Sequence, residues 1–139
     1  MTESKTIDND SGTILIVDDQ YGIRILLQEV LRKAGYQTLL AANGPQAIEL
    51  VSREKPRLVL LDMKIPGMDG LEILKKIKRM QPEMKVMIMT AYGELEIIQR
   101  AIKNGALTHF SKPFDIQELI DTVKKEVPLN ENLSHEEKG

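Results

Sequence analysis

Polar side chains that could do chemistry stand near the ends of four short apolar runs. Asp18 and Asp19 follow the first run, Asp62 the second and Thr90 the third, and Lys112 comes shortly after the fourth. The runs are residues 13–17, 58–61, 86–89 and 106–110. Such runs are typical of buried parallel strands, whose carboxyl ends meet at one edge of a sheet. Three carboxylates, a hydroxyl and an ammonium would then converge, a set that suits a divalent cation and a phosphoryl group.

The three aspartates form a candidate site for a hard cation. Magnesium takes oxygen ligands and keeps several waters, and Mn²⁺ or Ca²⁺ can use similar ligands. Clustered carboxylates also repel one another, which favours a bound cation. An alternative for Asp18 and Asp19 alone is that they begin the next helix, since Asp is a common N-cap residue. Asp62 alone could equally be a turn residue.

Asp62, Thr90 and Lys112 are the candidates for phosphoryl chemistry. A carboxylate can form an acyl-phosphate, so Asp62 is a possible nucleophile. Lys112 offers a compact positive charge to a phosphate oxygen. A solvated surface lysine is the alternative, but the following Pro113 constrains the chain locally, and an X-Pro bond can be cis. The hydroxyl of Thr90 could bond a phosphate oxygen, although Thr at a strand end is also common without such a role.

Strand-like and helix-like segments alternate along the chain. The predicted strands are residues 13–17, 36–41, 58–62, 86–90 and 106–110, and the predicted helices are residues 20–34, 43–53, 71–80, 94–104 and 115–127. This alternation favours a parallel sheet covered by helices on both faces. Five units are too few for a closed eight-unit barrel, so we expect an open, doubly wound α/β fold.

Composition excludes several classes of function. The chain has 139 residues, enough for one domain, and no Cys, which excludes disulfides and thiolate sites. Two His make a His-rich metal site implausible, and a net charge of -2 gives no case for nucleic acid. No apolar run reaches membrane-spanning length, and the start lacks a signal-peptide layout. We therefore expect a cytoplasmic protein with one domain at residues 13–127 and flexible tails at 1–12 and 128–139.

Four segments resemble the motifs of the receiver domain of bacterial response regulators. They are residues 14–19, 60–70, 89–91 and 111–114, in the expected order within residues 13–127. The resemblance implies a flavodoxin-like, doubly wound fold with five helices and the strand order 2-1-3-4-5. It also implies that Asp62 accepts a phosphoryl group from a phosphohistidine on a sensor histidine kinase, and that Thr90 and Lys112 contact that group. The magnesium ligands that it implies are Asp18, Asp19, Asp62 and the backbone carbonyl of Lys64.

Within this family, residues 18–27, 90–95 and 105–110 resemble the single-domain receivers of sporulation phosphorelays. This implies a phosphotransferase that passes the phosphoryl group from Asp62 to a histidine on a four-helix-bundle protein, with aspartyl-phosphate phosphatases as further partners. No DNA-binding segment follows residue 127, so we expect a stand-alone protein. The partner surface implied by the resemblance consists of Gln20, Tyr21, Gly22, Ile23, Leu26, Pro113 and Phe114.

Three residues beside the site are possible modulators. His109 stands where many receivers carry Tyr or Phe, which puts an aromatic switch coupled to Thr90 in doubt. His109 could instead be a partly exposed surface residue, or it could bind a metal or a partner. Lys64 and Tyr92 lie two residues beyond Asp62 and Thr90, where family analogy gives side chains an influence on how water reaches the acyl-phosphate. Simple surface exposure is the alternative for both.

The sequence leaves two rival functions open. One is a chemotaxis-like receiver that acts as a phosphorylation-dependent binding switch. The other is a metal-dependent phosphohydrolase with an aspartyl nucleophile. Such hydrolases commonly carry Asp-x-Asp after the first strand, whereas this chain has adjacent Asp18 and Asp19 there, and its candidate nucleophile Asp62 follows the third strand.

Overall fold

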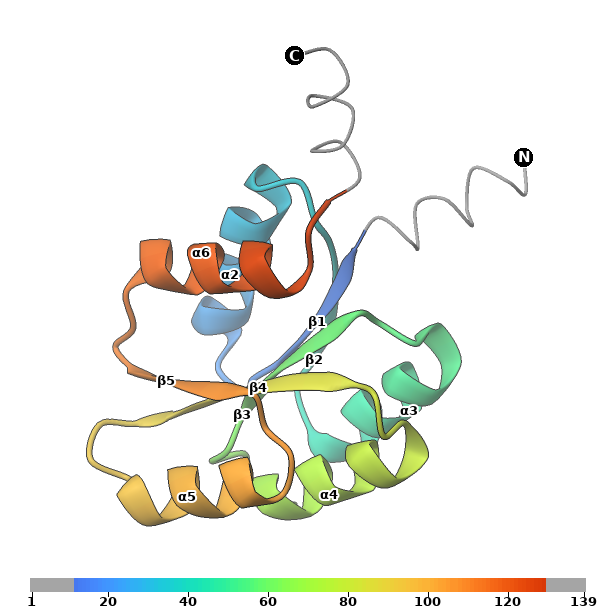
Figure 1. Cartoon of the computed structure of the whole chain (residues 1–139), viewed down its shortest axis with the longest axis vertical. Helices are drawn as coiled ribbons and strands as arrows, with labels where there is room; N and C mark the ends of the chain where they lie inside the picture. Colours follow the sequence, from blue (N-terminus) through green and yellow to red (C-terminus); the bar gives the residue numbers. More distant parts are fainter. Residues whose placement is uncertain (1–11, 130–139) are drawn as a thin grey trace.

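The computed structural model describes residues 12–129 and has five strands alternating with five helices (Figure 1). The strands are β1 (Thr13–Val17), β2 (Gln37–Ala41), β3 (Leu58–Asp62), β4 (Lys85–Ala91) and β5 (Thr108–Lys112). The helices are α2 (Tyr21–Lys33), α3 (Gly44–Glu54), α4 (Gly70–Met80), α5 (Leu95–Lys103) and α6 (Ile116–Glu126). None of these helices is long and apolar enough to cross a bilayer.

All neighbouring strands pair in parallel, in the order β2-β1-β3-β4-β5. The predicted doubly wound α/β fold and its strand order are therefore confirmed. Because every strand runs in the same direction, the carboxyl ends of β1, β3, β4 and β5 lie along one edge of the sheet. That edge is where open α/β sheets bind ligands.

Helices cover both faces of the sheet, with α2 and α6 on one face and α3, α4 and α5 on the other (Figure 1). Successive strand residues point to opposite faces, so each buried strand feeds two cores. In β1, Ile14 and Ile16 pack into the core that contains Leu27 of α2. Leu15 and Val17 pack into the opposite core, with apolar side chains of α3, α4 and α5. The central strands β1, β3 and β4 are therefore mainly apolar, with polar side chains at their ends, whereas the edge strand β5 is mostly polar.

Local sequence signals fix where several helices begin and end. The side chain of Asn43 accepts a hydrogen bond from the backbone N–H of Gln46 at 2.9 Å, which caps α3 as predicted. Asp115 caps α6 in the same way, accepting from the N–H groups of Gln117 and Glu118. Gly105, after α5, has φ of +106°, a left-handed conformation that favours glycine.

The fifth strand lies two residues later than the sequence predicts. The prediction placed it at residues 106–110, but β5 is Thr108–Lys112. Gly105 and Ala106 still belong to the turn after α5, where the N–H of Ala106 bonds the carbonyl of Ala101 at 3.0 Å. The register then pairs β4 with β5 from Met87–Thr108 to Ala91–Lys112. Lys112 is thus the last residue of the strand, and the sheet backbone itself positions it.

Buried contacts hold the C-terminal end of the described chain against the domain. The hydroxyl of Tyr36 donates a hydrogen bond to the carbonyl of Val127 at 2.8 Å. Leu129 is buried in the same core, so the packed region includes two residues beyond the predicted limit at 127. The rest of the predicted tails lies outside the described residues, and the division into a domain and two tails stays a prediction.

Candidate active site at the carboxyl edge of the sheet

The sheet topology brings the predicted chemical residues to one edge. Asp18 directly follows β1, Asp62 ends β3, Thr90 is the next-to-last residue of β4 and Lys112 ends β5. In the register of the sheet, Asp62 pairs with Met89, the neighbour of Thr90. The four side chains come from adjacent strands and therefore form one candidate site.

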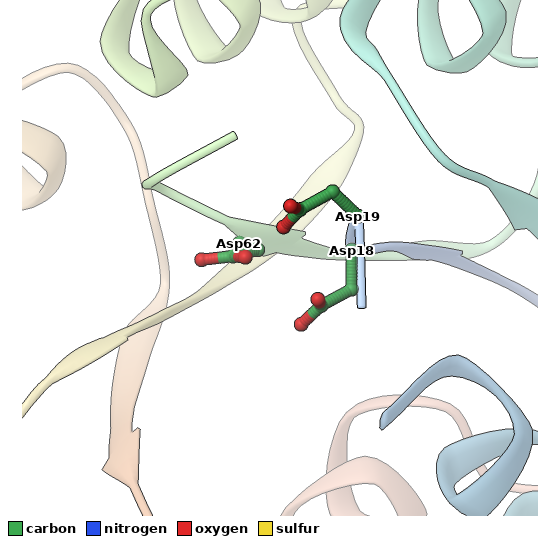
Figure 2. Close-up of side chains that lie close together, drawn as sticks. All are labelled: Asp18, Asp19 and Asp62. Atoms are coloured by element: carbon green, nitrogen blue, oxygen red, sulfur yellow. The ribbon is translucent and has the colours of Figure 1, made fainter. Parts of the chain in front are cut away.

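Three carboxylates meet at the centre of this site. Figure 2 shows Asp18 and Asp19, from the end of β1, close to Asp62. One carboxylate oxygen of each residue lies within 4.8 Å of those of the other two. Asp18 and Asp62 are almost fully buried, with exposed fractions of 0% and 3%, whereas Asp19 is exposed. Three hard oxygen donors with one side open to solvent fit a magnesium ion that keeps several waters.

Lys112 supplies the positive charge within the cluster. Its Nζ lies 2.8 Å from Oδ2 of Asp18 and 3.4 Å from Oδ2 of Asp62. Only 22% of the Lys112 side chain is exposed, so the alternative of a solvated surface lysine is wrong. The peptide bond between Lys112 and Pro113 is cis. The ammonium of Lys112 thus contacts two of the three carboxylates, those of Asp18 and Asp62.

Backbone N–H groups hold the two buried carboxylates in place. Oδ1 of Asp18 accepts from the N–H of Gln20 at 2.9 Å, and Oδ1 of Asp62 accepts from the N–H of Lys64 at 3.1 Å. Gln20 is the N-cap residue of α2 and makes no side-chain cap bond. The alternative that Asp18 and Asp19 are the N-cap of that helix is therefore wrong.

Burial and neighbouring charges shift the titration of two groups. Burial raises the pKa of Asp62, and the nearby charge of Asp18 raises it further, while the N–H of Lys64 and the ammonium of Lys112 oppose the change. For Lys112, burial by itself would lower the pKa. The hydrogen bond to Asp18 and the negative charges of Asp62 and Asp18 outweigh it, so the pKa of Lys112 is raised. Lys112 therefore keeps its charge at neutral pH.

Thr90 offers a free hydroxyl at the same edge. The residue is 1% exposed, and its Oγ1 has no hydrogen-bond partner among the residues that the structure describes. A buried hydroxyl without a partner is energetically costly. Its place beside Asp62 makes a phosphoryl oxygen a suitable partner, which fits the predicted role.

Arg24 is a contributor to the site that sequence reasoning missed. Its Nη1 donates a hydrogen bond of 2.7 Å to the backbone carbonyl of Asp18. The guanidinium also lies 5.7 Å from the ring centre of Tyr21, within range of a cation–π contact. Arg24 thus ties the first turn of α2 to the end of β1. An arginine one turn into the helix that follows Asp18 and Asp19 was the available signal.

The predicted partner surface lies at the start of α2 and after β5. Tyr21 and Leu26 are exposed hydrophobic residues, with exposed fractions of 70% and 43%, and Gln20, Gly22 and Pro113 are also exposed. Ile23 and Phe114 are half-buried and pack against the core beneath α2 and α6. Exposed apolar side chains beside the carboxylates suit a docking partner, and that role stays a prediction.

The three predicted modulators have different surroundings. His109 is exposed on β5 and lines an open cleft of about 340 Å³ together with Phe114 and Glu118. Tyr92 is 88% exposed. Lys64 makes an ion pair with Glu94, with 2.8 Å between Nζ and Oε2. Of the two side chains predicted to control access of water, Lys64 is thus tied to the neighbouring loop, whereas Tyr92 is largely surrounded by solvent.

A family model places the chain among known proteins. The model of the response regulator receiver domain matches residues 14–124. This range contains all of the sheet except Thr13, the first residue of β1, and all but the last two residues of α6. It therefore covers every residue of the candidate site.

Two relatives illustrate how far the likeness extends. Sporulation initiation phosphotransferase F of Bacillus subtilis is 66% identical over 119 residues, which are 86% of this chain and 96% of that protein. The transcriptional regulatory protein ZraR of Klebsiella oxytoca is 42% identical over 122 residues, 88% of this chain but 26% of that protein. The likeness thus spans almost all of the first relative and only about a quarter of the second.

Solved structures show the same fold. A CheY-like receiver domain protein from Methanospirillum hungatei has a TM-score of 0.80 and 30% identity, and the match covers 92% of this chain and 98% of that one. The receiver domain of NtrX from Brucella abortus has a TM-score of 0.79 and 34% identity, covering 82% of this chain and 97% of that one.

Proposed function

The chain is a receiver domain of the response regulator family, and we propose that it carries phosphoryl groups in a phosphorelay that controls the initiation of sporulation. Asp62 accepts the phosphoryl group from a phosphohistidine on a sensor histidine kinase. It then passes the group to a histidine on a downstream phosphotransferase. The 66% identity to sporulation initiation phosphotransferase F, over 96% of that protein, supports the relay role.

One observation of the structure carries the proposal. Asp62, a nearly buried carboxylate, lies beside two other aspartates and a lysine whose Nζ is 3.4 Å from its Oδ2. This arrangement supports Asp62 as the nucleophile, the aspartates as hard-cation ligands and Lys112 as the fixed positive charge. Catalysis of phosphoryl transfer needs little beyond such positioning and charge stabilisation.

Magnesium is the cofactor that we propose for this site. Its ligands would be the carboxylates of Asp18, Asp19 and Asp62 and the backbone carbonyl of Lys64, with Mn²⁺ or Ca²⁺ as substitutes. A bound Mg²⁺ would offset the negative charge of the carboxylates and of the incoming phosphoryl oxygens. The close approach of the three carboxylates supports this assignment.

The two transfer steps use the chain's own residues as follows. A carboxylate oxygen of Asp62 attacks phosphorus, the P–N bond of the phosphohistidine breaks, and the imidazole nitrogen keeps the electron pair and takes up a proton. In the second step a histidine nitrogen attacks phosphorus and loses its proton, and Asp62 leaves as a carboxylate. Lys112 and the hydroxyl of Thr90 hold phosphoryl oxygens in both steps.

Partners would approach over the start of α2 and the segment after β5. The exposed Tyr21 and Leu26 offer apolar contact to a four-helix bundle that presents the donor or acceptor histidine. Histidine kinases, the phosphotransferase and aspartyl-phosphate phosphatases would share this surface, because each must reach Asp62. We place the protein in the cytoplasm, where such relays operate.

A transfer assay tests the proposal. The protein is incubated with a radiolabelled, autophosphorylated sensor kinase from a spore-forming bacillus, separated from it, and mixed with a histidine phosphotransferase. We expect label on the wild type and none on Asp62→Asn. Asp121→Asn, a change at an exposed carboxylate on α6, is the matched control and should be labelled normally.

The fate of the label separates the rival functions. Its transfer to the phosphotransferase supports the relay. Its release only as free phosphate would support a phosphohydrolase, and a stable label that never moves on would support a binding switch. Labelling of Asp62→Asn at the wild-type level would overturn the assignment of the acceptor.

A further inference from the structure

An ion pair joins the two loops at the mouth of the site. The ammonium of Lys64, in the loop between β3 and α4, donates a hydrogen bond of 2.8 Å to Oε2 of Glu94, at the end of the loop between β4 and α5. Lys64 comes two residues after Asp62, and Glu94 comes four residues after Thr90. Because β3 and β4 are neighbours in the sheet, this Lys64–Glu94 bridge spans the ends of the two strands that carry those site residues.

Lys64 is held at both of its ends. Its backbone N–H donates to Oδ1 of Asp62 at 3.1 Å, and its side-chain ammonium is bound by Glu94. The aliphatic part of the side chain therefore runs from the Asp62 carboxylate to the beginning of α5. Lys64 therefore links the Asp62 carboxylate to the loop that precedes α5.

The side chain of Glu94 bonds to a neighbouring loop and not to the helix that Glu94 precedes. It is the N-cap residue of α5, yet its side chain makes no cap hydrogen bond. Asp or Asn at this position would ordinarily accept from the first N–H groups of the helix, whereas the longer Glu94 side chain is free to reach another partner. Its carboxylate accepts instead from Lys64, a residue 30 positions earlier in the sequence. The contact that Glu94 makes is thus specific to the neighbouring loop.

We propose that Glu94 is a positioning residue that holds the Lys64 side chain across the mouth of the site and so slows hydrolysis of the phosphoryl group on Asp62. The inference rests on the proposed function, because it concerns the lifetime of that group. In hydrolysis a water oxygen attacks phosphorus, the P–O bond to Asp62 breaks, Asp62 leaves as a carboxylate, and the water proton passes to solvent. A side chain fixed between the loops narrows the path of that water.

The expected effect is modest because the bridge is partly exposed. The exposed fractions of the Lys64 and Glu94 side chains are 56% and 31%, and ion pairs in such surroundings are weak and sensitive to salt. Loss of the bridge should therefore shorten the half-life of the phosphorylated protein by about two- to fivefold. Tyr92, which is 88% exposed, should contribute less.

The test measures the half-life of phosphorylated protein in the absence of any partner. The wild type is phosphorylated with phosphoramidate, whose P–N bond resembles that of phosphohistidine, the donor is removed, and the phosphorylated fraction is followed by intact mass. Glu94→Gln should lose the label faster. The matched control is Glu96→Gln, which removes an exposed ion pair with Arg100 on the same helix and should leave the half-life unchanged. Circular dichroism checks that both variants fold.

Two further measurements separate positioning from a general effect of mutation. Lys64→Met and the double variant Lys64→Met/Glu94→Gln should hydrolyse at the same rate, because Glu94 acts only through Lys64. Raising the ionic strength to about 0.5 M should shorten the wild-type half-life toward that of Glu94→Gln while changing the variant little.

Each outcome bears on one claim. Equal half-lives for the wild type and Glu94→Gln, or additive effects in the double variant, would overturn the role of Glu94 and leave the relay intact. Absence of any label on the wild type, whatever the variants do, would instead count against the proposed function, and the positioning role would fall with it.

Discussion

Asp62 and Lys112 carry charges that the fold has partly withdrawn from water. Asp62 is nearly buried beside Asp18, and the ammonium of Lys112 contacts both of these carboxylates. This makes Asp62 costly to ionise in the absence of a cation. The same features suit a carboxylate that must accept a phosphoryl group. The ammonium of Lys112 is already held beside the carboxylates before that group and its negative charge arrive.

Replacing Asp62 with Asn should stabilise the protein in cation-free buffer. Since the pKa of Asp62 is raised in the fold, its contribution to stability is complete below the ordinary pKa of 3.8 and is lost as pH rises through the raised value. At pH 7 the charged Asp62 is therefore destabilising, and Asp62→Asn should increase the free energy of unfolding by about 1 kcal/mol. Urea denaturation in EDTA at pH 7 and pH 5 measures the difference, which should shrink at the lower pH. A less stable variant, or a gain independent of pH, would contradict the explanation.

Replacing Lys112 with Met should have the opposite effect. It leaves the fully buried carboxylate of Asp18 without its cation, and breaking a buried pair typically costs about 3 kcal/mol. Lys112→Arg keeps the charge and should recover much of that loss, while Lys76→Met, at an exposed lysine on α4, should cost less than about 0.5 kcal/mol. Urea denaturation of the three variants tests this. If Lys112→Met were as stable as Lys76→Met, the contact between Lys112 and Asp18 would contribute little to the free energy of unfolding.

The loops after the strands are positioned by the helices that follow them. Helix α4 begins at Gly70, where a Cβ would lie 2.5 Å from the carbonyl oxygen of Met63 and 2.6 Å from its Cα. Only glycine allows the first turn of α4 to approach the backbone of the loop this closely. That packing fixes the loop whose next residue, Lys64, donates its N–H to Asp62.

Gly70→Ala should therefore destabilise the protein and disturb the site. The new methyl group meets backbone atoms, which cannot move aside as a side chain can, and overpacking of this kind costs about 1–3 kcal/mol. Gly22→Ala is the matched control, because a Cβ there has no neighbour within 4 Å and alanine favours the helix. Thermal unfolding should show a loss for the first variant and no loss for the second. Equal stability of the two would contradict the steric explanation.

For the molecule as a whole, the features that depend on local sequence pattern, above all the strands, could be predicted. Apolar runs located the strands, and the resemblance supplied their order. The start of β5 was wrong because Ala106 and Leu107 are apolar like a strand, yet Ala106 packs in a turn and Leu107 is exposed. The bond of Arg24 to the carbonyl of Asp18 was missed, although an arginine one turn into the following helix was an available local signal. The bond of Lys64 to Glu94 could not be predicted, because it depends on how two loops that are distant in the sequence lie in space and leaves no periodic signal.

Binding of a cation at the carboxylate cluster should change the stability of the entire fold. A ligand that binds only the folded state stabilises it by about 2.7 kcal/mol when present at 100 times its dissociation constant. Mg²⁺ should therefore shift the urea midpoint of the wild type upward. Asp19 is exposed and belongs to the carboxylate cluster, so Asp19→Asn should unfold like the wild type in EDTA but gain much less from Mg²⁺. Asp121→Asn, at an exposed carboxylate outside the cluster, should gain the full amount. An equal Mg²⁺ shift in all three proteins would mean that the ion binds elsewhere, because the loss of a ligand must weaken binding at the carboxylate cluster.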